Sequence, residues 1–238
     1  MFDAPGAGTG PTKGTFPYNS TQLINSNGVI TGYSVDSAAV LHGFVRDENG
    51  VVTTFDAPGA GTAAGQGTQS FAISPSGEIT GFYFDATDAV HGFLRDKKGV
   101  ITTFDLPGGG AGPAQGTYGG GFTPNGSILG VLIDAGSINH GFLLDKHGAV
   151  TTFDAPSGGT GPDQGTLPWD ISANGTIAGW TVDDAYVNHG FVRDKDGTIV
   201  EFDVPGGFMF PWASIAPNGT VVGVYFDATG AVHGFMRQ

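Results

Sequence analysis

One phrase returns five times along this chain: His-Gly-Phe, a short charged turn, and then Phe-Asp-x-Pro-Gly. Its histidines are spaced by 49, 49, 49 and 44 residues, and its Phe-Asp pairs by 53, 49, 49 and 49. A constant period of this size is the mark of a repeat architecture. Features shared by all copies are therefore expected to be structural, and departures in one copy are where function can lie. The histidines are His42, His91, His140, His189 and His233, and the pairs begin at Phe2, Phe55, Phe104, Phe153 and Phe202.

Each repeat contains four short runs of strand-forming residues. In the second repeat these runs lie at 68–74, 78–84, 90–95 and 100–104, and Gly, Pro or Asp turn signals separate them. Four such runs in succession predict a four-stranded antiparallel meander. No stretch places apolar residues at helical spacing over helical length, so almost no α-helix is expected.

Several of these runs carry large residues on both faces, as in Phe82, Tyr83 and Phe84. Each sheet must then be covered on both faces, which radial stacking of blades provides. The five repeats predict one domain over 1–238, an all-β, five-bladed β-propeller of four-stranded antiparallel blades. The N-terminal Phe2-Asp3 matches the end of a fourth strand, and we expect it to pair with the last blade and close the ring.

Composition excludes several classes of function. The chain has 9 Lys and Arg against 22 Asp and Glu, and its net charge of −13 disfavours nucleic acids and anionic membranes as partners. Cysteine is absent, which excludes disulfides, thiolate metal sites and a cysteine nucleophile. No apolar run reaches the ~18–20 residues of a membrane span. We expect a monomer.

The His-Gly-Phe phrase, followed by an Asp-x-x-Gly turn and a Thr-Thr-Phe-Asp strand, resembles the His-Ala-Phe repeat of bacterial extracellular β-propeller proteins. The similarity covers all five repeats, with Gly where that family has Ala. The resemblance implies the propeller fold and no common catalytic site. Together with an acidic, Gly-rich and Thr-rich composition without Cys, it predicts a bacterial protein that is extracellular or periplasmic, although no signal peptide is visible in this chain.

Two aspartates recur at fixed positions around each histidine. The first lies six residues before it, and we expect a structural hydrogen bond across the tight turn there. The second follows Phe, and we expect it to cap the x-Pro-Gly turn. No cofactor is expected; the alternative is Ca²⁺ bound by a ring of the second aspartates, because hard cations prefer oxygen ligands. The first set is Asp36, Asp85, Asp134, Asp183 and Asp227, and the second is Asp3, Asp56, Asp105, Asp154 and Asp203.

A long glycine-rich loop follows the outer strand of a repeat, and three copies of it end in Gln-Gly-Thr. One interpretation is a connector whose tight turns need positive φ. The functional alternative is a repeated, shallow site whose amide and hydroxyl groups bind a hydroxyl-rich ligand with avidity. The glutamines are Gln66, Gln115 and Gln164.

The copies differ most in the inner strand, which lines the axial channel of a propeller. Aligned on the glycine that follows, one position reads Gln22, Phe71, Gly120, Trp169 and Ala213, and the next reads Leu23, Ala72, Gly121, Asp170 and Ser214. Tyr18, Tyr118 and Trp212 lie just upstream. The pattern predicts an asymmetric, aromatic mouth with one carboxylate, which suits sugar rings. The structural alternative is that these aromatic rings only pack the channel.

These features favour a secreted, lectin-like protein that binds carbohydrate at the mouth, at the Gln-Gly-Thr loops, or at both. The mouth residues are Tyr18, Phe71, Tyr118, Trp169, Asp170 and Trp212, and the loop residues are Gln66, Gln115 and Gln164. One alternative is a polysaccharide hydrolase or lyase that uses Asp170, but glycoside hydrolysis usually needs two carboxylates and no second one is evident. An enzyme is therefore disfavoured and no catalytic residue is assigned. The other alternative is a non-catalytic protein-interaction scaffold.

Overall fold

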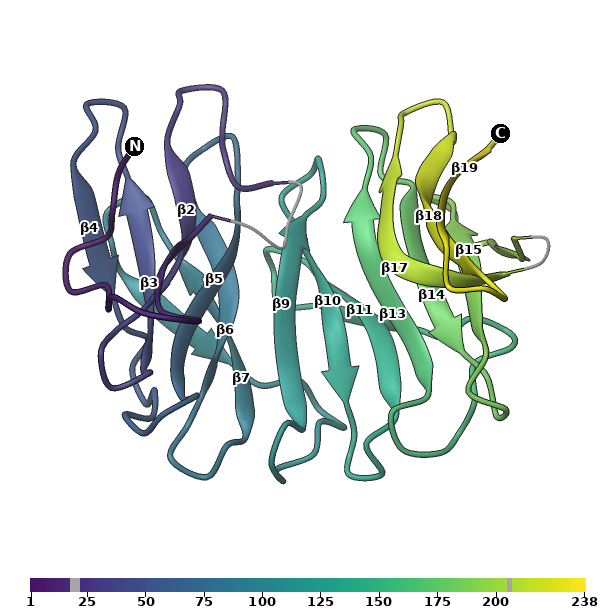
Figure 1. Cartoon of the computed structure of the whole chain (residues 1–238), viewed down its shortest axis with the longest axis horizontal. Helices are drawn as coiled ribbons and strands as arrows, with labels where there is room; N and C mark the ends of the chain where they lie inside the picture. Colours follow the sequence, from purple (N-terminus) through teal and green to yellow (C-terminus); the bar gives the residue numbers. More distant parts are fainter. Residues whose placement is uncertain (18–21, 205–206) are drawn as a thin grey trace. The chain divides into compact units, whose positions relative to one another are not determined.

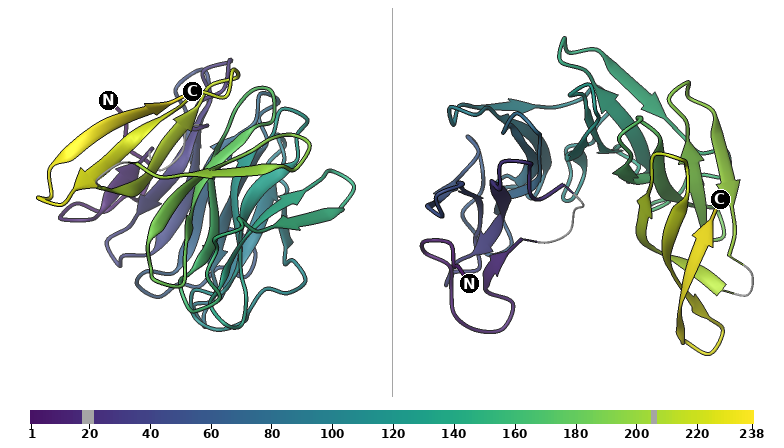
Figure 2. Two further views of the ribbon diagram at one scale, coloured as in Figure 1. Left: turned by 90° about the vertical axis from the view of Figure 1, so that its right-hand side faces the viewer. Right: turned by 90° about the horizontal axis from the view of Figure 1, so that it is seen from above.

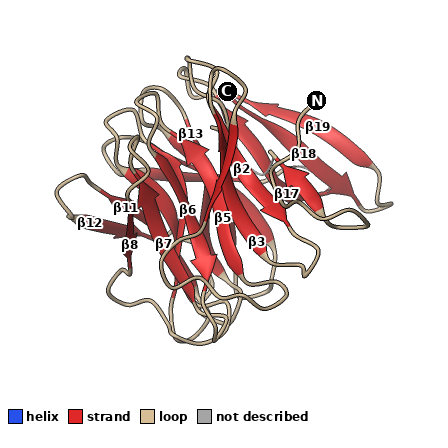
Figure 3. Cartoon of the chain, turned by 90° about the vertical axis from the view of Figure 1, so that its left-hand side faces the viewer, coloured by secondary structure: helices blue, strands red, loops and turns tan. Residues whose placement is uncertain are grey.

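The computed structural model describes residues 1–17, 22–204 and 207–238. The chain folds into two compact units, Met1–Phe122 and Thr123–Gln238. The described residues form strands, turns and loops without any helix (Figure 3), which confirms the predicted all-β class. None of them therefore belongs to a helix that could cross a membrane. One domain over 1–238 stays a prediction.

The first unit is built from antiparallel meanders (purple to teal in Figure 1). Its described strands are β1 (Gly14–Phe16), β2 (Ile30–Val35), β3 (Leu41–Arg46), β4 (Val52–Phe55), β5 (Gly67–Ile73), β6 (Ile79–Phe84), β7 (Val90–Arg95), β8 (Ile101–Phe104) and β9 (Gly116–Phe122). In the second repeat β5, β6, β7 and β8 pair in sequence order, which confirms the predicted meander. The start of β7 also pairs in parallel with the start of β9, through Val90 and Gly116.

The second unit repeats this pattern. Its described strands are β10 (Ile128–Ile133), β11 (Asn139–Leu144), β12 (Val150–Phe153), β13 (Gly165–Ile171), β14 (Ile177–Val182), β15 (Asn188–Arg193), β16 (Ile199–Phe202), β17 (Gly207–Ile215), β18 (Val221–Asp227) and β19 (Val232–Arg237). Strands β13 to β16 form a four-stranded antiparallel meander. Strands β17 to β19, toward the yellow end of the colour bar in Figure 2, form a three-stranded meander with the C-terminus after β19.

The phenylalanine of the His-Gly-Phe phrase is a core residue in the first four repeats. Phe44, Phe93, Phe142 and Phe191 are fully buried. In the second repeat Phe93 meets the ring of Phe55 edge-on, with centroids 6.0 Å apart, and the guanidinium of Arg95 lies 5.0 Å above Phe55. Because Phe55 ends the first repeat, burial of these rings and the cation–π contact fix the second repeat to the first. Equivalent ring and cation–π contacts join Phe153 to Phe191 and Arg193, and Phe202 to Phe235 and Arg237.

The predicted closure of the ring by the N-terminus is wrong. Residues 1–4 form no strand, and among the described strands β19 pairs with β18. The ring of Phe2 instead packs 5.9 Å from Phe44, with the guanidinium of Arg46 5.4 Å above it. Phe2 thus makes the contacts that Phe55 makes one repeat later, although residues 1–4 form no strand. The number of blades stays a prediction.

Candidate functional site

In the second repeat His91 stands between two carboxylates. Its Nδ1 lies 2.8 Å from Oδ1 of Asp105, which follows β8, and its Nε2 lies 3.4 Å from Oδ2 of Asp85, which opens the turn between β6 and β7. The ring of Tyr83 stacks on the imidazole, with centroids 4.9 Å apart. His91 thus links the two carboxylates, through Nδ1 to Asp105 and through Nε2 to Asp85.

Asp85 holds the turn together. Its Oδ1 accepts hydrogen bonds from the backbone N–H of Thr87 and Ala89 and from the Thr87 hydroxyl, at 2.7, 3.0 and 2.8 Å. Burial opposes ionisation of this carboxyl, but hydrogen bonds from Thr87, His91 and Ala89 outweigh it and keep the pKa of Asp85 below its ordinary value. The predicted structural hydrogen bond across the turn is confirmed. The same backbone bond is present at Asp36, Asp134, Asp183 and Asp227.

The prediction that the second aspartates cap the x-Pro-Gly turn is wrong. Asp105 bonds to the histidine instead, and the backbone N–H of Leu106 is satisfied by the hydroxyl of Thr117 at 3.1 Å. A threonine eleven residues after the turn replaces the aspartate as its cap, because the carboxylate faces across the sheet toward β7. The same threonine cap is made by Thr15, Thr68 and Thr166.

The glycine-rich loop after β8 is fixed against the β6–β7 turn. The N–H of Ala114 donates to the carbonyl of Asp88 at 2.8 Å, and both residues adopt left-handed φ, at 59° and 66°. The equivalent bonds join Gly65 to Ala39 and Asp163 to Ser137. The repeats therefore hold their loops in a preformed position.

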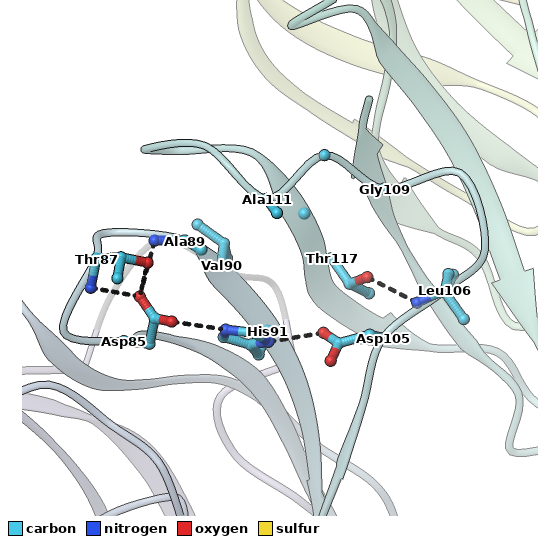
Figure 4. Close-up of a pocket in the computed structure, with 12 residues that line it drawn as sticks. Asp85, Thr87, Ala89, Val90, His91, Asp105, Leu106, Gly109, Ala111 and Thr117 are labelled. Carbon is cyan, nitrogen blue, oxygen red and sulfur yellow. Dashed lines mark hydrogen bonds and ion pairs between the residues drawn. The ribbon is translucent and has the colours of Figure 1, made fainter. Parts of the chain in front are cut away.

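The turn and this loop enclose a pocket of about 300 Å³ (Figure 4). Figure 4 shows the turn from Asp85 to Val90 on one side and Leu106 with Thr117 on the other, and the contact between His91 and Asp105 runs between the two sides. Glycines 109, 110 and 116 and Ala111 bring the loop backbone to the lining.

The pocket offers several acceptors and few donors. Oδ2 of Asp105 has no hydrogen-bond partner among the described residues, and 66% of that side chain is exposed. Oδ2 of Asp85, which contacts Nε2 of His91 at 3.4 Å, is a second carboxylate acceptor. Val90, Leu106 and Ala111 add apolar lining. This combination suits a neutral ligand with several hydroxyl donors and an apolar face.

The polar frame of the pocket recurs in other repeats. The Nδ1 atoms of His42, His140 and His189 lie 2.8, 2.8 and 2.6 Å from the second aspartates of their repeats, which are Asp56, Asp154 and Asp203. The last histidine, His233, contacts Asp227 at 3.0 Å and has no second carboxylate partner among the described residues.

The three predicted loop glutamines stabilise their own loops. The Oε1 atoms of Gln66, Gln115 and Gln164 each accept the N–H three residues earlier, at 3.1, 3.0 and 2.6 Å. Nε2 of Gln66 also donates to the Asp88 carboxylate at 2.9 Å. Gln66 and Gln164 are buried. Their side chains shape the loop, and ligand binding by them stays a prediction.

Two predicted mouth residues of the first unit pack on one ring. Phe71 and Tyr118 lie 6.3 and 4.7 Å from Phe82 on β6, measured between ring centroids. The Tyr118 hydroxyl donates to the carbonyl of Ala114, and burial raises the pKa of Tyr118 to about 12. These contacts are those of packed rings, as the structural alternative expects.

In the second unit Trp169 packs 5.7 Å from Trp180, whereas its neighbour Asp170 is buried and bonded to backbone. Oδ1 of Asp170 accepts the N–H of Ile171 at 2.8 Å, and Oδ2 accepts the N–H of Ile215 on β17 at 3.0 Å. The carboxylate thus joins β13 to β17.

Two further predicted residues cannot be placed in the site: Tyr18 lies outside the described residues, and so does the side chain of Trp212 on β17. The described residues contain no group of three or more His, Asp or Glu side chains arranged to hold a metal ion. A carboxylate ring that binds Ca²⁺ stays a prediction, and four of the five second aspartates contact a histidine.

Sequence reasoning found the recurring aspartates and histidines but missed the pocket that they line. It also missed the threonine cap and the stacking of Tyr83 on His91. Two constant spacings in the sequence could have predicted these contacts. The aspartate follows the histidine by fourteen residues, and the threonine follows the residue that it caps by eleven.

No model of a known protein family matches the chain, and no curated protein matches it. Among solved structures it is similar to a triple arginine mutant of AofleA from Arthrobotrys oligospora, with a TM-score of 0.55 and 13% identity over 95% of this chain and 72% of that one. It is also similar to a mutant of the Aleuria aurantia lectin in complex with Fucα1-6GlcNAc, with a TM-score of 0.51 and 13% identity over 93% and 73%. A third structure, of the same fungal lectin, has a TM-score of 0.50 and 12% identity over 93% and 72%, and is described as a six-bladed β-propeller with a fucose recognition mode. At this identity the likeness shows the fold alone, which is that of a β-propeller.

Proposed function

We propose that this protein is a lectin-like β-propeller that binds carbohydrate through repeated pockets between the His-bearing strand and the glycine-rich loop. The observation that carries the proposal is the pocket lined by Asp85, His91 and Asp105, whose polar frame recurs in other repeats. Five blades, one for each repeat, are part of the same proposal.

The chemistry of the pocket fits the hydroxyl groups of a sugar. A sugar hydroxyl can donate to Oδ2 of Asp105, and another can donate to Oδ2 of Asp85. The C–H face of the ring can contact Val90 and Leu106. Charged acceptors strengthen such hydrogen bonds relative to neutral ones.

The fold comparisons support the same function. The Aleuria aurantia lectin structures hold Fucα1-6GlcNAc and α-methyl-L-fucoside, so a propeller of this kind can be a lectin. Which sugar this chain binds is left to experiment, because fold alone does not fix function.

We place the ligand at the loop pockets rather than at the axial mouth. Phe71, Tyr118 and Trp169 are packed against neighbouring rings, and both oxygens of Asp170 accept backbone N–H groups. The same bonds do not favour Asp170 as an acid or base. A monomeric, extracellular or periplasmic protein fits this function, and sedimentation and fractionation test those two points.

The test is a glycan-array screen of the folded protein, followed by calorimetry on any hit with Asp105→Asn. This substitution keeps the size of the side chain but removes a charged acceptor, so we expect binding to lose one site per chain. Asp196→Asn is the matched control, because it removes an equal charge from an exposed turn outside this pocket. Unchanged stoichiometry and affinity in Asp105→Asn, with a hit that the wild type binds, would reject the pocket.

A further inference from the structure

A second pocket, of about 250 Å³, lies in the second unit. It is lined by the turn before β10, the turn between β13 and β14, and the end of β15. Its polar lining includes Arg193, Lys195, Asn125, Asn174 and Ser127, and no carboxylate is among its lining residues. The chain has nine Lys and Arg residues and a net charge of −13, and two of these cations line a pocket whose lining contains no Asp or Glu.

Arg193 is nine-tenths buried, at 9% exposed. Its guanidinium stacks 4.7 Å above the ring of Phe153, and its Nη1 donates to the carbonyl of Asp194 at 3.3 Å. Its Nε is buried without a hydrogen-bond partner. Burial lowers the pKa of the guanidinium, and the charge of Asp194 opposes this shift. A buried cation without a bonded anion is costly, so an anion is favoured beside it.

Asp194, the carboxylate whose charge acts on Arg193, is bonded to its own turn. Oδ1 of Asp194 accepts the backbone N–H groups of Asp196 and Thr198 at 3.0 and 2.8 Å, and so it caps its own turn. Lys195 has no hydrogen bond or ion pair within the part of the chain that the structure describes. Its ammonium group is therefore available to a ligand.

The second repeat provides an internal comparison. There Glu78 occupies the position of Thr176, and its Oε2 accepts from the hydroxyls of Ser76 and Ser74 at 2.9 and 3.4 Å. The equivalent turn thus carries its own negative charge. In the fourth repeat Thr176 leaves that turn uncharged.

We propose that this pocket binds an oxyanion, a carboxylate or sulfate group, between Lys195 and Arg193. Hydrogen bonds from ammonium and guanidinium groups to oxyanions are charge-assisted and strong. The amide of Asn125 and the hydroxyl of Ser127 line the same space and can complete the coordination. This site differs in place and charge from the carbohydrate pocket, so either can exist without the other. The oxyanion is the carboxylate of an acidic sugar or a free inorganic ion.

The test is a calorimetric titration of the full chain with sodium glucuronate and, separately, sodium sulfate at constant ionic strength. We expect saturable 1:1 binding in the wild type. Lys195→Gln removes one charge and Thr176→Glu places a carboxylate on the turn, as Glu78 does in the second repeat, so each should weaken binding about tenfold or more. Lys195 is exposed and Thr176 is half-buried, so neither substitution removes the contact of Arg193 with Phe153.

Lys98→Gln is the matched control, because it removes an equal charge from a turn of the first unit, and it should bind as the wild type does. Binding of both anions assigns the pocket to a simple oxyanion, and binding of glucuronate alone assigns it to the carboxylate of a sugar. Absence of saturable binding, or an equal loss in Lys98→Gln, overturns the proposal.

Discussion

Gly92 lies directly against the ring of Phe104, so closely that a Cβ at position 92 would stand 2.4 Å from a ring carbon. The two residues face each other across β7 and β8. The same approach joins Gly43 to Phe55, where the distance is 2.7 Å. Glycine stands between His and Phe in the repeated phrase because the phenylalanine that ends the outer strand fills the space of a side chain.

Gly92→Ala is therefore expected to destabilise the protein by about 1–3 kcal/mol, the usual cost of overpacking a core. Gly234→Ala is the matched substitution in the last repeat, where a Cβ would stand 3.9 Å from the carbonyl oxygen of Gly223. It should cost less than about 0.5 kcal/mol. Urea unfolding of both variants measures the difference.

The same two variants also test whether Gly234, on β19, is covered by an aromatic ring. If Gly234→Ala were as destabilising as Gly92→Ala, a phenylalanine ring would have to cover Gly234 in solution. That result would contradict the described pairing of β19 with β18 alone.

Acidification should destabilise the fold through the first aspartates. Backbone hydrogen bonds, led by that of Val40 at Asp36 and that of Val187 at Asp183, lower the pKa of both carboxyls from 3.8. A carboxyl whose pKa is lower in the folded than in the unfolded state stabilises above its unfolded pKa and loses this contribution as the pH falls. The free energy of unfolding should decrease below about pH 4.5, and Asp183→Asn should make this decrease shallower. An unchanged slope in urea titrations from pH 6 to pH 3 would exclude this role.

His189 should make the protein less stable as the pH rises, the opposite of the effect of the aspartates. Burial opposes its protonation, but hydrogen bonds and charges from Asp203 and Asp183 outweigh burial and raise its pKa above 6.5. A histidine with a raised folded pKa stabilises below its unfolded pKa, and the contribution is lost as the pH rises through the folded value. Stability should therefore decline from about pH 6.5 upward, and His189→Gln should reduce that decline. His147→Gln, outside the repeated frame, is the control that should keep it.

Asp170→Ala should destabilise the second unit. It leaves the N–H groups of Ile171 and Ile215 without their acceptor, and one unsatisfied buried donor costs about 1–3 kcal/mol. Asp196→Ala, at an exposed position, should change the free energy of unfolding by less than about 0.5 kcal/mol. Equal stability of the two variants in urea would remove the structural role of Asp170.

The periodicity of the sequence was enough to predict the fold class, because every repeat carries its own turn signals and its own buried Phe, such as Phe93. The partner of Asp105 was not predictable in the same way. An aspartate before x-Pro-Gly is a common turn cap, and only the antiparallel pairing of β7 with β8 brings it opposite His91.

The surroundings of the predicted mouth residues were also not predictable from the sequence. An alignment column identifies which positions vary, but not whether the side chains reach solvent or a neighbouring ring. Phe71 and Trp169 share a column, and each packs on a ring of the adjacent strand. Asp170 differs from its column neighbours because it accepts an N–H from β17, a contact over 45 residues that no local pattern encodes.

Sugar binding by the loop pockets is tested first by the calorimetric stoichiometry of the wild-type protein with a sugar selected on a glycan array. A histidine with both of its carboxylates occurs at His42, His91, His140 and His189. Repeated loop pockets predict several equivalent sites per chain, up to one for each of these histidines. A single site that is lost in Trp169→Ala, or no binding to any sugar, would contradict this prediction.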